Sequence, residues 1–233
     1  LSKYASNAFL ATKISFINEM AVLCEKTGAD VIDVANIMGM DGRIGNYFLH
    51  PGPGYGGSCF PKDISALIHQ AESVSYDFKI GNAVQLINDS QVIRIIDHLE
   101  TFFDDGFSDK RVGMLGLSFK PNTDDIRLSK PLEIAQALFS KGSEILAYDP
   151  KAMEAAKSVF PEATYVDDLY DVAENSDMII LGTEWNVFRE LDLFRLYKLM
   201  NRPLFVDLRH VYSPDELKFA GFEGYVLGRN LRV

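Results

Sequence analysis

The chain has 233 residues and a formal net charge of -10, with 47% hydrophobic and 12% aromatic residues. This balance is typical of a globular protein of one large or two modest domains and excludes a disordered chain. The net charge predicts no binding to nucleic acid or anionic lipid. The chain has no signal-peptide pattern, no apolar run of the roughly 18 residues that span a membrane, and only two cysteines, Cys24 and Cys59. We therefore expect a cytoplasmic protein.

The first hundred residues are predicted to be almost entirely helical. Apolar residues recur at helical spacing from Tyr4 to Cys24, and Gly28 is expected to end that helix. A second helix is predicted from Asp30 to Met38, where Gly39 should break it. Residues 51–57 should form a shaped loop, because glycine and proline are unfavourable inside a helix. Two further helices are predicted over residues 62–73 and 79–103.

Beyond residue 105, short apolar runs alternate with helical patterns. This alternation predicts a parallel sheet with right-handed crossovers, covered by helices on both faces. About five strands are expected, in doubly wound order. The predicted fold class is therefore α/β, with an all-helical domain over residues 1–105 followed by a Rossmann-like doubly wound parallel sheet over residues 106–233. The strands are predicted over residues 111–117, 144–148, 163–166, 178–181 and 204–206, and the helices over residues 132–139, 153–159, 169–174 and 188–198.

The segment Gly-Gly-Ser-Cys-Phe-Pro-Lys-Asp, residues 56–63, carries the strongest chemical signal. Proline is tolerated in the first turn of a helix, so Pro61 predicts that Cys59 lies at a helix amino terminus, where backbone N–H groups favour a thiolate. Asp63 follows one helical turn later, placed to hold a water or to accept a proton. A cysteine beside a phenylalanine can also be a small core residue, and Cys24, inside an apolar helix, fits that interpretation.

Residues 52–63, Gly-Pro-Gly-Tyr-Gly-Gly-Ser-Cys-Phe-Pro-Lys-Asp, resemble the active-site motif of the UDP-glucose/GDP-mannose dehydrogenase family. Residues 3–7, Lys-Tyr-Ala-Ser-Asn, resemble the family's helix with a catalytic lysine and asparagine. Residues 116–127, which begin Gly-Leu-Ser-Phe-Lys-Pro, resemble the motif that opens its third domain. The resemblance implies two successive NAD-dependent oxidations of a nucleotide sugar, from alcohol to aldehyde and then to acid, with the intermediate held on a cysteine.

The resemblance also implies individual roles. Cys59 is the expected nucleophile, Lys3 stabilises the developing alkoxide, Asn7 holds the oxyanion, and Asp63 orders a water. Arg43 is the arginine expected to reach the substrate of a neighbouring subunit, and Arg127 is expected to reach the NAD pyrophosphate. The remaining substrate contacts implied by the resemblance are Phe48, Leu49, Tyr55, Gly56, Phe119, Lys120 and Arg209.

The expected partners are a UDP-sugar, with GDP-mannose or UDP-N-acetylmannosamine left open as alternatives, and a second copy bound through the helix at residues 79–103. NAD is the expected cofactor, with its main binding domain outside this chain, which would then be inactive alone. Gly113 to Gly116 is not a dinucleotide fingerprint, and Asp149 is at most the vestige of a ribose-binding acid. The four histidines lack metal-ligand spacing, so no metal is expected. A different class stays open: a non-catalytic nucleotide-binding dimerisation module in which Cys59 is inert.

Overall fold

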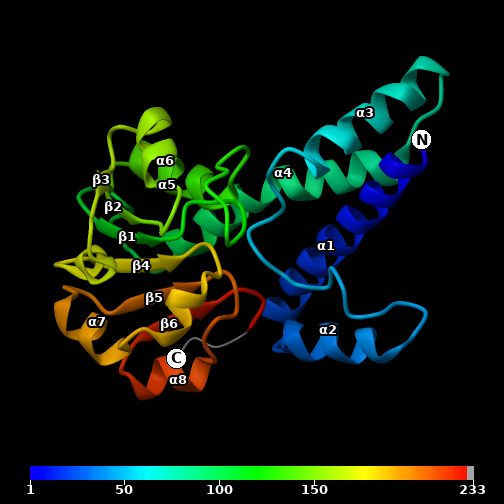
Figure 1. The fold of residues 1–233 in the computed structure, drawn as a ribbon. Helices are drawn as coiled ribbons and strands as arrows, with labels where there is room; N and C mark the ends of the chain where they lie inside the picture. The colour runs from blue at the N-terminus through cyan, green and yellow to red at the C-terminus, as the bar shows by residue number, and fades with distance from the viewer. Residues whose placement is uncertain (230–233) are drawn as a thin grey trace. The chain divides into compact units, whose positions relative to one another are not determined.

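The computed structural model describes residues 1–229, which form two compact units that we treat separately (Figure 1). The helical unit comprises residues 1–92 together with residues 228–229, and the sheet unit comprises residues 93–227. The division falls inside α4 (Lys79–Glu100). The domain boundary expected between residues 105 and 106 stays a prediction. Within the described residues, none of the helices has the length and apolar character needed to cross a membrane.

The helical unit contains α1 (Ser2–Thr27), α2 (Val31–Met40), α3 (Phe60–Ser73) and the first part of α4. Gly28 ends α1 in the left-handed conformation at φ 81°, as predicted. The helix break expected at Gly39 is wrong, since α2 continues to Met40. A Cβ at Gly39 would lie 1.6 Å from Oδ1 of Asn46, so this position needs glycine for a close approach and not for a turn.

The sheet unit is a six-stranded parallel sheet in the order β3-β2-β1-β4-β5-β6, which confirms the predicted doubly wound fold (Figure 1). The expected number of five strands is wrong by one. The sequence reading missed β6 and the preceding α8, because the Glu-Gly-Tyr-Val of β6 interrupts an apolar pattern with a charge and a glycine. The strands are β1 (Arg111–Leu115), β2 (Glu144–Tyr148), β3 (Thr164–Tyr165), β4 (Met178–Leu181), β5 (Leu204–Asp207) and β6 (Glu223–Val226).

Helices connect successive strands, and right-handed crossovers place those after β1 and β2 on the opposite face from those after β4 and β5. The single helix predicted over residues 188–198 is divided in two, because the side chain of Asp192 accepts a hydrogen bond from the backbone of Arg195 at 3.0 Å and starts a new helix. The helices are α5 (Lys130–Ser140), α6 (Met153–Val159), η1 (Leu169–Ala173), η2 (Asn186–Glu190), α7 (Leu193–Leu199) and α8 (Pro214–Phe219).

The strand order reverses between β1 and β4, so the connections that leave these two strands diverge. In open α/β sheets, ligands bind at this reversal, outside the carboxyl ends of the strands. Every strand of this sheet runs parallel to its neighbours, so the segments that follow β1, β2, β4 and β5 all emerge at one edge. That edge is where the sheet unit can present polar groups to a ligand.

Candidate active site and nucleotide-binding loops

Cys59 is the residue that caps the amino terminus of α3, with Pro61 in the first turn, as predicted. The preceding Gly57 has φ 75°, a conformation that glycine adopts without strain. Cys59 is exposed, whereas Cys24 is buried inside the helical unit. Burial raises the pKa of the Cys24 thiol above its usual value. The chain therefore has one accessible sulfur and one buried sulfur.

The carboxylate of Asp63 gathers the other predicted catalytic residues. Its side chain is fully buried, and its backbone N–H donates to the carbonyl oxygen of Cys59 at 2.9 Å. Oδ2 of Asp63 accepts a hydrogen bond from Nδ2 of Asn7 at 2.6 Å and lies 3.7 Å from Nζ of Lys3. The structure thus brings Lys3 and Asn7, one helical turn apart on α1, to the same carboxylate oxygen.

The second oxygen of Asp63 is also buried. Among the described residues, no donor makes a hydrogen bond to Oδ1, and the nearest cation is Nζ of Lys62 at 3.9 Å. An ammonium and an amide can stabilise a developing oxyanion, and a carboxylate oxygen without a donor can hold a water or accept a proton. This arrangement supplies the polar groups that addition to a carbonyl at a neighbouring thiol requires.

Two buried asparagines fasten the loop at residues 51–57. Oδ1 of Asn18 accepts from the backbone N–H of Gly52 at 2.9 Å. Oδ1 of Asn88 accepts from the N–H of Tyr55 at 2.8 Å, and its Nδ2 donates to the carbonyl oxygen of the same residue at 3.2 Å. The sequence reading missed both anchoring roles. An asparagine on the apolar stripe of a helix was the available signal, because a buried amide needs partners.

In this loop region, several of the residues predicted to contact the substrate have side chains packed against the protein. Leu49 and Tyr55 are buried, and burial raises the pKa of the Tyr55 phenol. The ring of Phe60 contacts the rings of Phe48 and Tyr55 edge-on, with centroids 5.9 and 5.8 Å apart. Phe48 itself has φ 66°, which is unusual for a bulky residue, and Gly56 is partly exposed between these groups. The loop is shaped by packing before any ligand binds.

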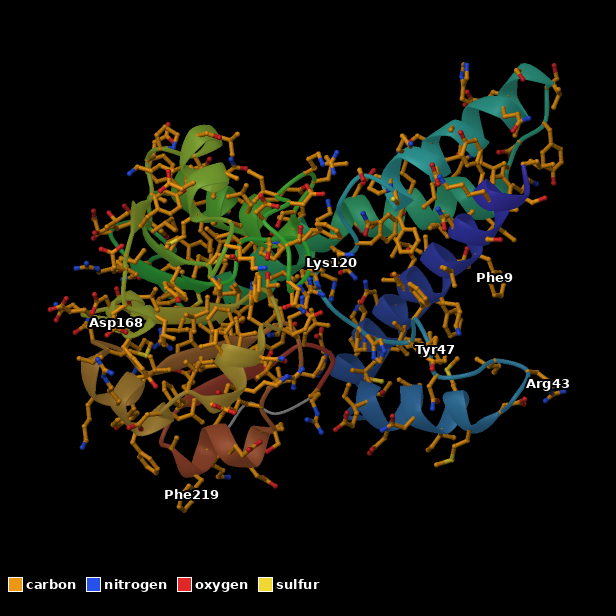
Figure 2. The ribbon with its side chains drawn as sticks, in the orientation of Figure 1. Phe9, Arg43, Tyr47, Lys120, Asp168 and Phe219 are labelled. Atoms are coloured by element: carbon orange, nitrogen blue, oxygen red, sulfur yellow. The ribbon has the colours of Figure 1, made fainter. Side chains whose placement is uncertain are left out.

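Arg43 lies on the loop that follows α2, with its side chain pointing away from the helical unit (Figure 2). Its Nε donates to Oδ1 of Asp41 at 2.9 Å and its Nη2 to Oδ2 at 2.5 Å, and this hydrogen bonding lowers the pKa of Asp41. Nζ of Lys13 donates to the carbonyl oxygens of Ile44 and Gly45 at 3.0 and 3.2 Å. Lys13, which the sequence reading missed, therefore holds the loop that carries Arg43.

In the sheet unit, Phe119 and Lys120 lie on the loop that follows β1. Lys120 is exposed, and its Nζ lies 5.3 Å from the ring centroid of Phe119 (Figure 2). Further along the loop, Arg127 forms a two-point pair with Asp125, from Nε to Oδ1 at 2.9 Å and from Nη2 to Oδ2 at 2.7 Å. This pairing lowers the pKa of Asp125.

Arg209 lies just beyond β5 and reaches the same edge of the sheet. Its Nε donates to the carbonyl oxygen of Gly182 at 2.8 Å and lies 3.2 Å from Oε2 of Glu184, and its Nη2 donates to the carbonyl oxygen of Phe119 at 3.3 Å. The backbone N–H of Arg209 in turn donates to the buried carboxylate of Asp207 at 2.8 Å. The structure therefore brings Phe119, Lys120 and Arg209 to neighbouring loops.

Within residues 1–229, no three or more His, Cys, Asp or Glu side chains are grouped so that they could hold a metal ion. The polar chemistry of the molecule instead lies in two places, the Cys59–Asp63 segment of the helical unit and the strand-end loops of the sheet unit. The helical unit thus presents an accessible thiol, and the Rossmann-like unit presents cations beyond its strands.

Comparison with known proteins identifies the family. Residues 1–90 match the central domain of the UDP-glucose/GDP-mannose dehydrogenase family, and residues 113–214 match its UDP binding domain. The chain belongs to this family.

The similar proteins are longer than this chain. It is 44% identical over 229 residues to UDP-glucose 6-dehydrogenase of Rhizobium meliloti (98% of this chain, 52% of the relative) and 45% identical over 232 residues to UDP-glucose 6-dehydrogenase YwqF of Bacillus subtilis (99% and 52%). The solved UDP-glucose dehydrogenase of Pyrobaculum islandicum superposes with a TM-score of 0.82 at 39% identity, covering 91% of this chain and 47% of that one. The chain thus spans about half the length of the curated relatives it matches.

Proposed function

We propose that the protein is an NAD-dependent UDP-glucose 6-dehydrogenase, which oxidises UDP-glucose by four electrons to UDP-glucuronate. The observation that carries the proposal is the exposed sulfur of Cys59 at the start of α3, one turn from the Asp63 carboxylate that joins Asn7 and Lys3. The names of the relatives at 44–45% identity support the same substrate. In this proposal the helical unit does the chemistry and the sheet unit binds the UDP part.

Cys59 acts after the sugar hydroxyl has become an aldehyde. Its sulfur adds to the aldehyde carbon, and the carbonyl oxygen takes up negative charge that Lys3 and Asn7 stabilise. Loss of a hydride from that adduct leaves a thioester. Water, ordered by Oδ1 of Asp63, which has no hydrogen bond among the described residues, then cleaves the carbon–sulfur bond to give the carboxylate and the free thiol.

NAD would supply the oxidising power by accepting one hydride in each of the two oxidation steps. Arg127 is the residue of this chain that we assign to its pyrophosphate, because it is exposed and lies on the strand-end loop with Lys120. Because Nε and Nη2 of Arg127 pair with Asp125, a phosphate that took the same two donors would replace that carboxylate. The thiol must stay reduced throughout, so we place the protein in the cytoplasm.

Turnover by the full-length protein tests the sugar specificity. With UDP-glucose we expect two NADH for each UDP-glucuronate formed, and with GDP-mannose or UDP-N-acetylmannosamine at the same concentration we expect a much smaller rate. A clear preference for GDP-mannose would assign the protein to the other branch named in its family. One NADH for each product would contradict the thioester step.

The rival class, a non-catalytic nucleotide-binding module, differs in the behaviour of the sulfur. Alkylation of the chain with iodoacetamide at pH 7, followed by peptide mass mapping, compares Cys59 with Cys24 in one sample. We expect Cys59 to react faster than a free cysteine in an unfolded peptide and Cys24 to react far more slowly, because it is buried and its pKa is raised. A rate at Cys59 no faster than that of the peptide favours the non-catalytic module.

We also propose a homodimer formed through α4. Ile80, Leu86 and Ile93 of this helix are 61, 70 and 65% exposed, and the last two are seven residues apart on one face. Exposed large apolar side chains in such a row favour burial against a second copy. Leu86→Glu should lower the mass measured by light scattering from dimer to monomer, whereas Asp89→Glu on the same helix should not.

A further inference from the structure

Asp149 directly follows β2, and its carboxylate is completely buried at the carboxyl edge of the sheet. Six hydrogen bonds end on it. Oδ2 accepts from the backbone N–H groups of Leu117 (2.8 Å) and Ser118 (3.0 Å), the hydroxyl of Ser118 (3.1 Å) and the indole of Trp185 (3.2 Å), while Oδ1 accepts from the backbone N–H groups of Lys151 (2.9 Å) and Ala152 (2.8 Å).

The donors come from the segments that follow three different strands, β1, β2 and β4. In a dinucleotide-binding Rossmann domain, an acid at the end of the second strand faces the ribose of the ligand. Here both oxygens of Asp149 are occupied by donors of the protein itself, so the acid is turned inward. Asp149 occupies the position at which a Rossmann domain binds the ribose, but its hydrogen bonds hold the protein's own backbone.

The segment it organises is the first part of the loop that carries Phe119 and Lys120. Two more buried bonds fix the same segment, from Oγ1 of Thr183 to the carbonyl oxygen of Ser118 and from Oγ of Ser129 to the carbonyl oxygen of Leu117, both at 2.6 Å. The backbone N–H and carbonyl groups of residues 117–118 are therefore all held by hydrogen bonds. The charge of Asp149 lies at the centre of that network, and charge-assisted hydrogen bonds are the stronger ones.

We propose that Asp149 is a positioning residue for nucleotide binding: it holds residues 117–118 so that Phe119 and Lys120 are presented in place to the UDP part of the substrate. This inference rests on the proposed function, since it takes UDP as the ligand of that loop. A carboxylate is required chemically, because both oxygens face N–H groups. An asparagine would direct its own N–H₂ at a donor in either of its two orientations.

The chain offers a matched control at the opposite edge of the sheet. Asp177 immediately precedes β4, and its carboxylate accepts from the backbone N–H of Arg111 at 2.9 Å and from Nδ2 of Asn201 at 2.6 Å. Asp177→Asn makes the same chemical change as Asp149→Asn, at the amino ends of the strands and away from the loop of Lys120. A loss of general stability affects both variants, whereas a loss of loop position affects only Asp149→Asn.

The experiment compares UDP binding by calorimetry and amide hydrogen exchange of ligand-free residues 117–120 in the 233-residue chain and both variants. We expect Asp149→Asn to bind UDP about tenfold more weakly than Asp177→Asn, because part of the binding free energy is then needed to order the loop. We also expect exchange at residues 117–120 to be faster only in Asp149→Asn. Equal UDP affinity of the two variants, or unchanged exchange at residues 117–120, would overturn the inference.

Trp185 is the only tryptophan of the sequence, so its indole reports directly on this network. If Asp149→Asn does not fold, Ser118→Ala serves in its place. It removes a hydroxyl that donates to Asp149 and accepts from the Trp185 indole, so we expect a weaker but measurable loss of UDP affinity and a shifted indole N–H resonance. Absence of both changes in Ser118→Ala also overturns the inference. If the unaltered chain does not bind UDP, the proposed function of the sheet unit fails, and the exchange rates of the ligand-free loop still decide whether Asp149 positions it.

Discussion

The two units hold their functional loops with different chemical groups. The helical unit fastens residues 51–57 with the neutral amides of Asn18 and Asn88, and the sheet unit fastens its strand-end loops with the buried carboxylates of Asp149 and Asp207. An amide both donates and accepts, so Asn88 can satisfy the N–H and the carbonyl of one residue. A carboxylate only accepts, which suits the backbone N–H groups at the ends of parallel strands.

The helical unit also has a buried carboxylate, and it differs from the two in the sheet unit. Both oxygens of Asp149 accept hydrogen bonds, whereas Oδ1 of Asp63 receives no hydrogen bond from the described part of the chain. A buried acceptor without a donor is costly, and at a folded site it marks a place for a water or a substrate. The comparison therefore separates carboxylates whose two oxygens hold the backbone from one that keeps an oxygen without a hydrogen bond in the described residues.

Removal of the Cys59 sulfur should have the largest effect. In the full-length protein, Cys59→Ala should lower the rate of acid formation by more than about a thousandfold, because no covalent intermediate can form. UDP affinity should stay unchanged, since we propose that the sheet unit supplies that binding. Cys24→Ala is the matched control and should keep the activity. Acid formation by Cys59→Ala at a rate near that of the unaltered protein would contradict the division of labour between the units.

The carboxylate at the end of β5 should make the sheet unit sensitive to pH. Burial raises the pKa of Asp207 from 3.8 to about 6. As the pH rises between these values, the unfolded chain releases the proton first, so the stabilising contribution of Asp207 is present below pH 4 and is lost by pH 6. The pKa difference of about two corresponds to about 3 kcal/mol in the free energy of unfolding.

Urea unfolding of the unaltered chain and of Asp207→Asn at pH 4 and pH 7 isolates this contribution. The stability difference between the two proteins, unaltered minus variant, should fall by about 2 kcal/mol from pH 4 to pH 7, because part of the contribution is already lost at pH 4. The carboxyls whose pKa is lowered by neighbouring hydrogen-bond donors titrate in both proteins and cancel. For Asp125→Asn the difference should stay nearly constant between pH 4 and pH 7 and should fall only below pH 4, since Arg127 lowers the pKa of Asp125 from 3.8. A difference that does not depend on pH would show that Asp207 does not titrate in this range.

Asp63→Asn should separate catalysis from stability. Turnover of the full-length protein should fall by about a hundredfold, the usual contribution of a residue that handles a proton. The free energy of unfolding should change by less than about 1 kcal/mol, because Oδ1 has no hydrogen bond to lose and an amide oxygen can still accept from Asn7. Asp149→Asn should instead lose stability and bind UDP more weakly, while turnover at saturating UDP-glucose should fall far less than in Asp63→Asn. A loss of stability in Asp63→Asn as large as that in Asp149→Asn would remove the distinction between the two carboxylates.

Local signals in the sequence were enough to place the sulfur of Cys59 at the start of a helix. Pro61 fixed the start of α3, and the spacing of Lys3 and Asn7 put both on one side of α1. The anchors could not be found in this way. Asn88 bonds to a residue 33 positions away and Asp149 to residues 31 and 32 positions away, so their partners exist only once the chain has folded. The helix break at Gly39 was predicted wrongly for the same reason, because Asn46, which packs against this glycine, belongs to a later loop.

The smallest expected effect concerns the neutral amide side chains that hold the loop of the helical unit. Asn88→Ala leaves the N–H and the carbonyl of Tyr55 buried without partners, which should cost about 2 kcal/mol in the free energy of unfolding. Asn82→Ala on the same helix removes only an exposed hydrogen bond to Asp77 and should cost less than about 0.5 kcal/mol. The loss in Asn88→Ala should be the same at pH 4 and pH 7, since an amide does not titrate. A loss that varied with pH would mean that the loop of Cys59 also depends on a charged group.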